Sequence, residues 1–224
     1  MIERYFPFII ISGFIGIFAL IFFLSYLYGK KRTENLNKYA QMNGFTFTKD
    51  PTNPTQIDFI NDFKIFNIGR SRKTKNIIQG KKNQISLTIF DYRYTVGGGK
   101  NSHTYNQTII KVKLNTSVPN FYLGKENFFT KIGSKIGFND INFETHKEFS
   151  DYYNLKGNHE IKIKQCFTTQ ILTFFEQNKF DFFILGHNNN MLFYKTGKRL
   201  KPEEINPRIE EIIKIIKLFD KGEY

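Results

Sequence analysis

The pattern of hydrophobic and polar positions begins with one long uncharged segment near the start of the chain. Residues 5–29, YFPFIIISGFIGIFALIFFLSYLYG, contain no charged side chain. At about 1.5 Å per residue, a helix of this length exceeds the roughly 30 Å hydrocarbon core of a bilayer. Tyrosines stand at both ends, and no small-residue cleavage site follows. The segment therefore predicts a single uncleaved transmembrane helix, with residues 1–29 as the anchor.

The charges beside this segment predict its orientation. Glu3 and Arg4 precede it, whereas Lys30, Lys31 and Arg32 follow it. Basic residues favour the cytoplasmic side of a span. We therefore expect a protein of the inner (cytoplasmic) membrane whose C-terminal body faces the cytoplasm.

The next segment, residues 30–44, predicts a short juxtamembrane helix. Leu36, Tyr39 and Ala40 fall on one face at helical spacing, and Gly44 is a suitable C-terminal stop. A soluble domain is expected over residues 45–224, with a possible subdivision near residue 146.

Beyond the helix, the pattern changes to short runs rich in aromatic and β-branched residues, which are typical of strands. Strands are predicted at residues 45–48, 63–69, 85–96, 104–114 and 120–124. In the later part we expect extended segments at 139–143 and 148–155, helices at 159–167 and after 168, a hairpin at 179–195 that turns at 186–190, and a last helix at 207–219. Pro202 and Pro207 suit first helical positions. The fold class is α+β: a single transmembrane helix, then an antiparallel sheet with C-terminal helices.

The glycine run at residues 97–100, GGGK, resembles a phosphate-binding loop only at first sight. A P-loop requires Ser or Thr after the lysine and a helix after the loop. Asn101 stands there instead, and an alternating strand-like segment follows. The run therefore predicts the tip of a β-hairpin between residues 85–96 and 104–114.

The strand at residues 85–96 carries one unusual carboxylate. Alternation places Asp91 in the same row as Ile85, Leu87 and Ile89, and places the aromatic residues on the opposite face. A carboxylate in an apolar row needs a partner, and Arg93 is the nearest one in the sequence. An ion pair is the simpler interpretation of Asp91, and a functional carboxylate is the alternative.

A basic run provides the second candidate site. No acidic residue occurs between Phe63 and Phe90, and GRSRKTK within that stretch predicts an exposed loop. Its basic residues are Arg70, Arg72, Lys73 and Lys75. Near a bilayer such residues attract anionic lipid, and they also suit an acidic partner. A merely solvated loop is the alternative.

Composition and residue spacing argue against several kinds of site but do not identify a function. The chain has 33 basic and 20 acidic residues and one cysteine, Cys166, so no intrachain disulfide is possible and a buried apolar thiol is expected. The four histidines show no metal-ligand spacing, and no nucleophile motif is present. We therefore expect no metal, no cofactor and no nucleic-acid partner.

Several short stretches resemble a broad family of bacterial single-pass membrane proteins. They are MNGFTF, FNIG, NIIQG, IFDYRY with the glycine hairpin and TYNQTI, FYL, and the later run EFSDYYNLKGNHE, FTTQIL and MLFYKTGKR. FDYRY is the most specific of them. The resemblance implies an anchored α+β domain and carries no activity, substrate or catalytic residue. Thr169 stands where the family pattern has a proline.

These observations favour a non-enzymatic interaction module, an accessory subunit of a bacterial envelope assembly. Its partners would be membrane or cytoplasmic proteins, and Ser12 and Gly16 could bring two spans together. One alternative is a membrane-anchored enzyme in which Asp91 and a histidine meet in a cleft. Another is a domain that binds the anionic lipid surface through the basic run.

Overall fold

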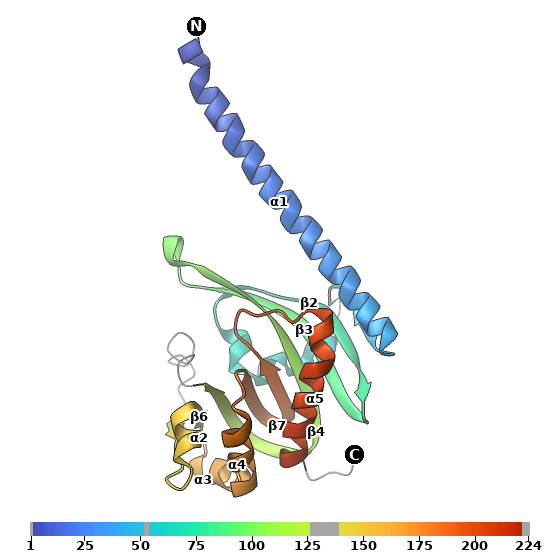
Figure 1. The fold of residues 1–224 in the computed structure, drawn as a ribbon, viewed down its shortest axis with the longest axis vertical. Coiled ribbons are helices and arrows are strands. Elements are labelled where there is room, and N and C mark those ends of the chain that lie inside the picture. Colours follow the sequence, from blue (N-terminus) through green and yellow to red (C-terminus); the bar gives the residue numbers. More distant parts are fainter. Residues whose placement is uncertain (1, 52–53, 126–138, 221–224) are drawn as a thin grey trace.

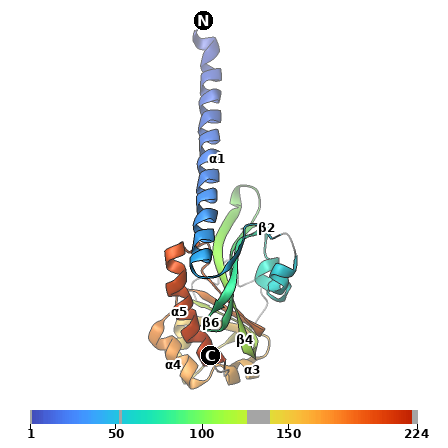
Figure 2. The same cartoon turned by 90° about the vertical axis from the view of Figure 1, so that its right-hand side faces the viewer.

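The computed structural model describes residues 2–51, 54–125 and 139–220, and the side chains of residues 2–12, 54–56 and 58 lie outside the description. One long helix projects from an α+β body (Figure 1). The predicted fold class is confirmed: an N-terminal apolar helix, an antiparallel sheet and C-terminal helices. A quarter turn shows the helix rising alone from one end of the body (Figure 2).

The helix α1 (Ile2–Met42) continues from the apolar segment into the body without a break. Within the described part of the chain, it is the one helix long and apolar enough to cross a membrane. Its large apolar side chains between residues 14 and 28 are exposed, with Phe22 77% exposed. Leu36, Tyr39 and Ala40, which were predicted to share one face of a helix, are buried against the body. Gly44 follows with φ +69°, a conformation that suits glycine at a helix end.

A seven-stranded antiparallel sheet forms the body. Its order is β1-β2-β3-β4-β6-β5, and β7 also pairs with β4. The strands are β1 (Thr46–Thr48), β2 (Arg70–Lys82), β3 (Ile85–Val96), β4 (His103–Lys125), β5 (Asn139–Ile141), β6 (Tyr153–Gly157) and β7 (Phe183–Tyr194). The 23-residue β4 is the central strand, because β3 and β6 pair along one of its edges and β7 along the other.

The predicted hairpin is confirmed. β3 and β4 pair from Leu87–Val112 to Val96–His103, and the glycine run forms the turn between them. Gly97 has φ +78°, and a Cβ there would lie 2.3 Å from the carbonyl oxygen of Asn101. The hairpin projects from the body on the side from which α1 rises (Figures 1 and 2).

The two faces of the sheet pack in separate cores, as the alternation in residues 85–96 predicted. Ile85, Leu87 and Ile89 join the larger core, whereas Phe90 and Tyr92 join the smaller one. The helices α2 (Lys147–Tyr152), α3 (Glu160–Cys166), α4 (Thr169–Asn178) and α5 (Pro202–Phe219) contribute to the larger core. The 3-10 segments η1 (Pro54–Asp62) and η2 (Lys64–Asn67) contribute to the smaller core.

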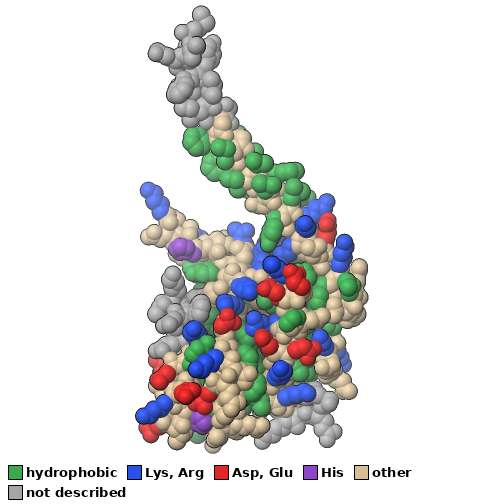
Figure 3. Space-filling view, viewed as in Figure 1, with side chains coloured by type: hydrophobic (Ala, Val, Ile, Leu, Met, Phe, Trp, Pro, Cys, Tyr) green, Lys and Arg blue, Asp and Glu red, His purple; other side chains and the backbone are tan. Residues whose placement is uncertain are grey.

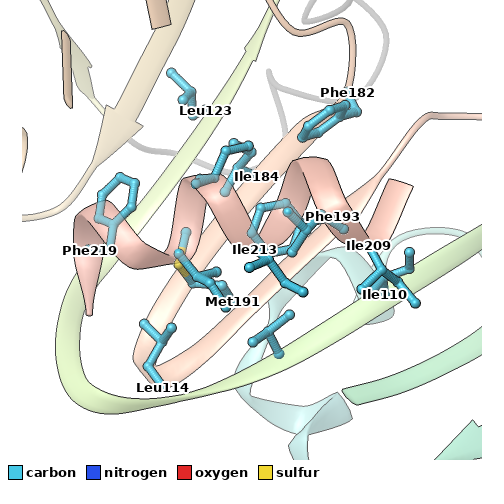
Figure 4. Close-up of a cluster of buried hydrophobic side chains, with 14 of the residues drawn as sticks. Ile110, Leu114, Leu123, Phe182, Ile184, Met191, Phe193, Ile209, Ile213 and Phe219 are labelled. Atoms are coloured by element: carbon cyan, nitrogen blue, oxygen red, sulfur yellow. The ribbon is translucent and has the colours of Figure 1, made fainter. Parts of the chain in front are cut away.

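The stripe of the last helix is buried, as expected. Ile209, Ile213 and Phe219 of α5 contact side chains of β4 and β7 in the larger core (Figure 4). Burying an isoleucine side chain fully contributes about 1.5–3 kcal/mol. Pro202 occupies the first turn as predicted, but Pro207 does not begin a helix and lies inside α5.

Two predictions around the basic run were wrong. Residues 63–69 do not form a strand: they contain η2, where Ile65 and Phe66 are both buried. Consecutive burial does not fit the alternation of a strand with one solvated face. Residues 70–75 are exposed as expected, apart from Thr74 and Lys75, but they belong to β2 and not to a loop. β1 pairs only with Ile77–Gln79, so this end of β2 is an edge, where charged residues are common.

Two later segments also differ from the prediction. Residues 179–195 contain no hairpin: β7 is one strand, because β4 is long enough to pair with both of its halves. The turn-like run instead marks an irregular register at Asn188, which has φ 52°. Residues 148–155 were expected to be extended: residues 148–152 lie in α2 instead, whereas residues 153–155 begin β6 as expected.

Cys166 gives a prediction that depends on pH. Burial raises the pKa of its thiol from 9.0 to about 11. We expect iodoacetamide to alkylate the folded protein at pH 8 about 100-fold more slowly than the protein unfolded in urea, because only the thiolate reacts. The folded-state rate should then rise about tenfold per pH unit up to about pH 11. Mass spectrometry of the alkylated peptide measures both rates, and equal rates at pH 8 would contradict the burial of this thiol.

Candidate functional site

The predicted carboxylate, Asp91, lies in the middle of β3 and is only 4% exposed. The Arg32 guanidinium binds it through two hydrogen bonds, from Nε to Oδ2 at 2.8 Å and from Nη2 to Oδ1 at 2.7 Å. The Asn76 amide donates to Oδ2 at 2.9 Å, and the Thr108 hydroxyl donates to Oδ1 at 3.1 Å. Both oxygens of the carboxylate are therefore occupied.

The predicted partner of Asp91 was wrong. The partner is Arg32, which comes from α1, and not Arg93, which lies two residues along the same strand. Side chains at i and i+2 of a strand leave the backbone about 6.6 Å apart, whereas the Arg32 guanidinium contacts the carboxylate directly. Arg32 reaches the carboxylate from above the sheet, and its side chain is only 9% exposed. We expected Arg32 as one of three flanking charges, and the structure adds this second role.

Further hydrogen bonds connect the ion pair to three more parts of the body. Arg32 Nη1 donates to the carbonyl oxygen of Leu200 at 2.9 Å, and the Leu200 amide donates to Thr108 Oγ1 at 3.0 Å. Thr33 donates to Asn76 Oδ1 at 2.9 Å. We call Arg32, Thr33, Asn76, Asp91 and Thr108 the anchor network. It joins α1 to β2, β3, β4 and the segment before α5.

The backbone of β2 is shaped to place Asn76. The strand shifts register between Lys75 and Ile78, and Asn76 has φ 53°, a region that asparagine tolerates better than most residues. Its backbone amide donates to the carbonyl oxygen of Lys49 at 2.7 Å. This hydrogen bond stabilises the irregular backbone. Its side chain can then reach both Thr33 and Asp91.

A cleft of about 620 Å³ opens beside the anchor network. Ser25, Tyr26, Tyr28 and Gly29 of α1 form one wall, and β2 and β3 form another. Because these α1 residues end the uncharged segment, the cleft lies at the end of the body that the apolar helix enters. We call it the junction cleft. In the space-filling view, Lys and Arg side chains gather where the helix meets the body (Figure 3).

The lining of the junction cleft is strongly basic. Its acidic residues are Glu34 and Asp91. Its basic residues are Lys30, Arg32, Lys49, Lys73, Lys75, Arg93 and Arg199. Asp91 forms an ion pair with Arg32, and Asp50 forms one with Lys75, whose Nζ lies 3.4 Å from Asp50 Oδ1. Within the described part of the chain, no acidic side chain pairs with Lys30, Lys49, Lys73 or Arg93.

Arg199 shows the electrostatic cost of this arrangement. Burial lowers the pKa of its guanidinium; Asp91 acts in the opposite sense, and nearby Arg32 and Arg93 lower the pKa further. One of its nitrogens donates to Asn106 at 2.9 Å, but its buried Nε has no hydrogen-bond partner among the described residues. The site therefore holds more positive charge than its own residues neutralise.

The predicted basic run is divided between two surroundings. Lys73 and Lys75 line the junction cleft. Arg70 donates to the carbonyl oxygen of Gly97, and Arg72 donates to that of Phe66 at 3.0 Å. Strand alternation explains part of the division, and the register shift between Arg70 and Lys73 explains the rest. The lysines and not the arginines of the run belong to the cleft.

The cleft does not bring Asp91 together with a histidine. None of the described residues that line it is a histidine. His146 instead contacts Glu176, with Nδ1 3.2 Å from Oε1. The described residues also contain no group of three side chains that could hold a metal ion.

Sequence reasoning missed several members of this site. Asn76 and Thr108 are polar residues in strands and carry no distinctive local signal. Lys49 and Arg199 lie 42 and 108 residues from Asp91 in the sequence, so only the fold brings them to it. Tyr26 and Tyr28 are among the tyrosines noted at the ends of the uncharged segment, but their place in a cleft could not be predicted.

Comparison with known proteins gave one structural likeness. No protein-family model matches the chain, and no curated protein matches it. The crystal structure of the mycobacterial trehalose monomycolate transport factor A, TtfA, superposes with a TM-score of 0.57 at 10% sequence identity. The match covers 86% of this chain and 98% of that one. At this identity the likeness shows a shared fold.

Proposed function

We propose that this protein is a non-enzymatic, membrane-anchored interaction module that serves as an accessory subunit of a bacterial envelope assembly. Its span lies in the inner membrane and its body faces the cytoplasm. The observation that carries this proposal is the anchor network, which fixes the body directly to the end of the apolar helix. A body held in this way presents the same surfaces to neighbouring membrane proteins at all times.

Two further observations support the proposal. The matched structure is described as a transport factor for trehalose monomycolate, and nearly all of that chain shares this fold. A common fold supports a related kind of role and not a common cargo. The buried carboxylate Asp91 is engaged on both oxygens, so it serves here as the attachment point of α1. The flanking Lys30 and Lys31 support the cytoplasmic orientation.

Cross-linking in the native membrane tests the proposal. A C-terminally tagged full-length chain is cross-linked, extracted in mild detergent and quantified by mass spectrometry. We expect at least one membrane or cytoplasmic protein at an abundance comparable to that of the bait. A control bait carries residues 1–44 on an unrelated soluble protein, so it retains the span and lacks the body.

Three results would contradict the proposal. One is a bait that purifies without a comparable partner, and another is a partner that the control bait recovers equally well. The third is saturable turnover of a phosphoester or peptide by the purified chain. The side of the membrane is checked separately, because a C-terminal green fluorescent protein fusion becomes fluorescent in the cytoplasm.

A further inference from the structure

We propose that the junction cleft binds the phosphate-bearing headgroup of an anionic membrane lipid. This inference requires that α1 lies in a bilayer and does not depend on any protein partner. It differs from binding to a flat basic surface, because the groups that would hold the headgroup line a cavity and come from α1, β2 and β3.

The position of the cleft is the first argument. Tyr26 and Tyr28 line it and also end the uncharged segment of α1. Tyrosines of this kind sit at the level of lipid headgroups. Arg32 lies six residues beyond Tyr26, or about 9 Å along the helix. The headgroup layer on each side of the hydrocarbon core is about 5–8 Å thick, so the cleft opens into that layer.

The charge of the cleft is the second argument. Lys30, Lys49, Lys73 and Arg93 are exposed, and the described residues supply none of them with an ion pair or a hydrogen bond from the side chain. Gathering like charges without a ligand costs energy, which an anion in the cleft would offset. Lys73 and Arg93 are directly opposite each other on β2 and β3, so both can reach one anion.

The chemistry of the donors is the third argument. Arginine binds phosphate with two parallel N–H groups, and lysine binds it as a point charge. Arg32 cannot take part in this way, because Asp91, Leu200 and Thr108 accept hydrogen bonds from four of its five N–H groups. The phosphate contacts therefore fall to Arg93, Lys73 and Lys30. The acyl chains of such a lipid would lie along the apolar surface of α1, which is exposed between residues 14 and 28.

Native mass spectrometry of the full-length chain in dodecyl maltoside tests this site. The probes are dioleoylphosphatidylglycerol, dioleoylphosphatidylcholine and soluble glycerol-1-phosphate. We expect phosphatidylglycerol to bind at least about tenfold more tightly than phosphatidylcholine. The double variant Lys73→Gln/Arg93→Gln should weaken phosphatidylglycerol binding about 30-fold, from about 1 kcal/mol per basic residue.

The matched control removes the same charge elsewhere. Lys214 and Lys217 are exposed on α5 and do not line the cleft, so Lys214→Gln/Lys217→Gln should change the affinity less than about twofold. Both variants replace exposed side chains, and unchanged melting temperatures confirm that each is folded.

Three outcomes would overturn the proposal. Equal losses in the two double variants would mean that net charge and not the cleft attracts the lipid. Equal affinity for the two lipids would remove the role of the negative charge. Binding of glycerol-1-phosphate as tight as that of phosphatidylglycerol would assign the cleft to a soluble phosphate compound instead of a lipid. Failure of the cross-linking experiment to find a protein partner would leave these results unaffected.

Discussion

Replacing Arg32 with methionine should destabilise the protein by about 3–5 kcal/mol, because the change leaves a buried carboxylate without its counter-charge. Asp91 is 4% exposed and receives two of its hydrogen bonds from Arg32. Methionine keeps much of the length of the side chain and removes all its donors. Chemical denaturation of the full-length chain in detergent, followed by circular dichroism, measures the loss.

A double-mutant cycle separates the interaction energy of the ion pair from the other effects of the substitutions. Asp91→Leu alone should cost a similar amount, since it leaves Arg32 buried and unpaired. Arg32→Met/Asp91→Leu should cost at least about 1 kcal/mol less than either single change, because no buried charge then remains. The exposed pair Glu160–Lys164 is the control, and its loss should cost about 0.5 kcal/mol or less. A single-variant loss near that of the control pair would show that the anchor network contributes little.

Replacing Phe121 with alanine should cost about 3–5 kcal/mol, the range for removing a buried aromatic side chain from a well-packed core. The ring is 1% exposed. It lies 5.0 Å from the ring of Phe167 and 5.9 Å from that of Phe219, between centroids. Phe121 therefore connects β4 to the C-terminal ends of both α3 and α5, and denaturation monitored as above measures its contribution.

The glycine opposite Phe121 provides the matched test. Phe121 pairs with Gly186 of β7, and a Cβ on Gly186 would lie 2.3 Å from the ring. Gly186→Ala should therefore cost about 1–3 kcal/mol in the native chain through overpacking. In the Phe121→Ala background the same change should cost less than about 0.5 kcal/mol, because the ring is gone. Additive losses would show that the ring does not occupy the space above Gly186.

Local sequence patterns predicted the elements whose hydrophobic pattern matches their burial in the fold. The apolar helix, the strand at residues 85–96 and the buried stripe of the last helix follow from hydrophobic periodicity, and the hairpin follows from the glycine run between two strand-like segments. β2 was missed because its charged end lies on a sheet edge, where hydrophobic alternation is not required. β7 was divided in two because the turn-like residues near Asn188 form an irregular register along β4 and not a turn.

In the candidate site, too, only the features with a local signal in the sequence could be predicted. Asp91 could be recognised because a carboxylate interrupted an apolar row. Its partner could not, because Arg32 lies 59 positions away and reaches it only after α1 packs on the sheet. The concentration of basic residues in the junction cleft depends on the same packing, which brings Lys30, Lys49 and Arg199 to β2 and β3.

The continuity of α1 has a mechanical consequence. In the proposed membrane arrangement its uncharged stretch is longer than the hydrocarbon core is thick, and tilting of the helix, more so in a thinner bilayer, is one way to bury that stretch. α1 enters the body without a break, and the Arg32–Asp91 ion pair attaches it to the sheet. A tilt of the helix therefore also tilts the body. In the proposed membrane arrangement, hydrophobic mismatch therefore changes the angle between the β3–β4 hairpin and the membrane plane.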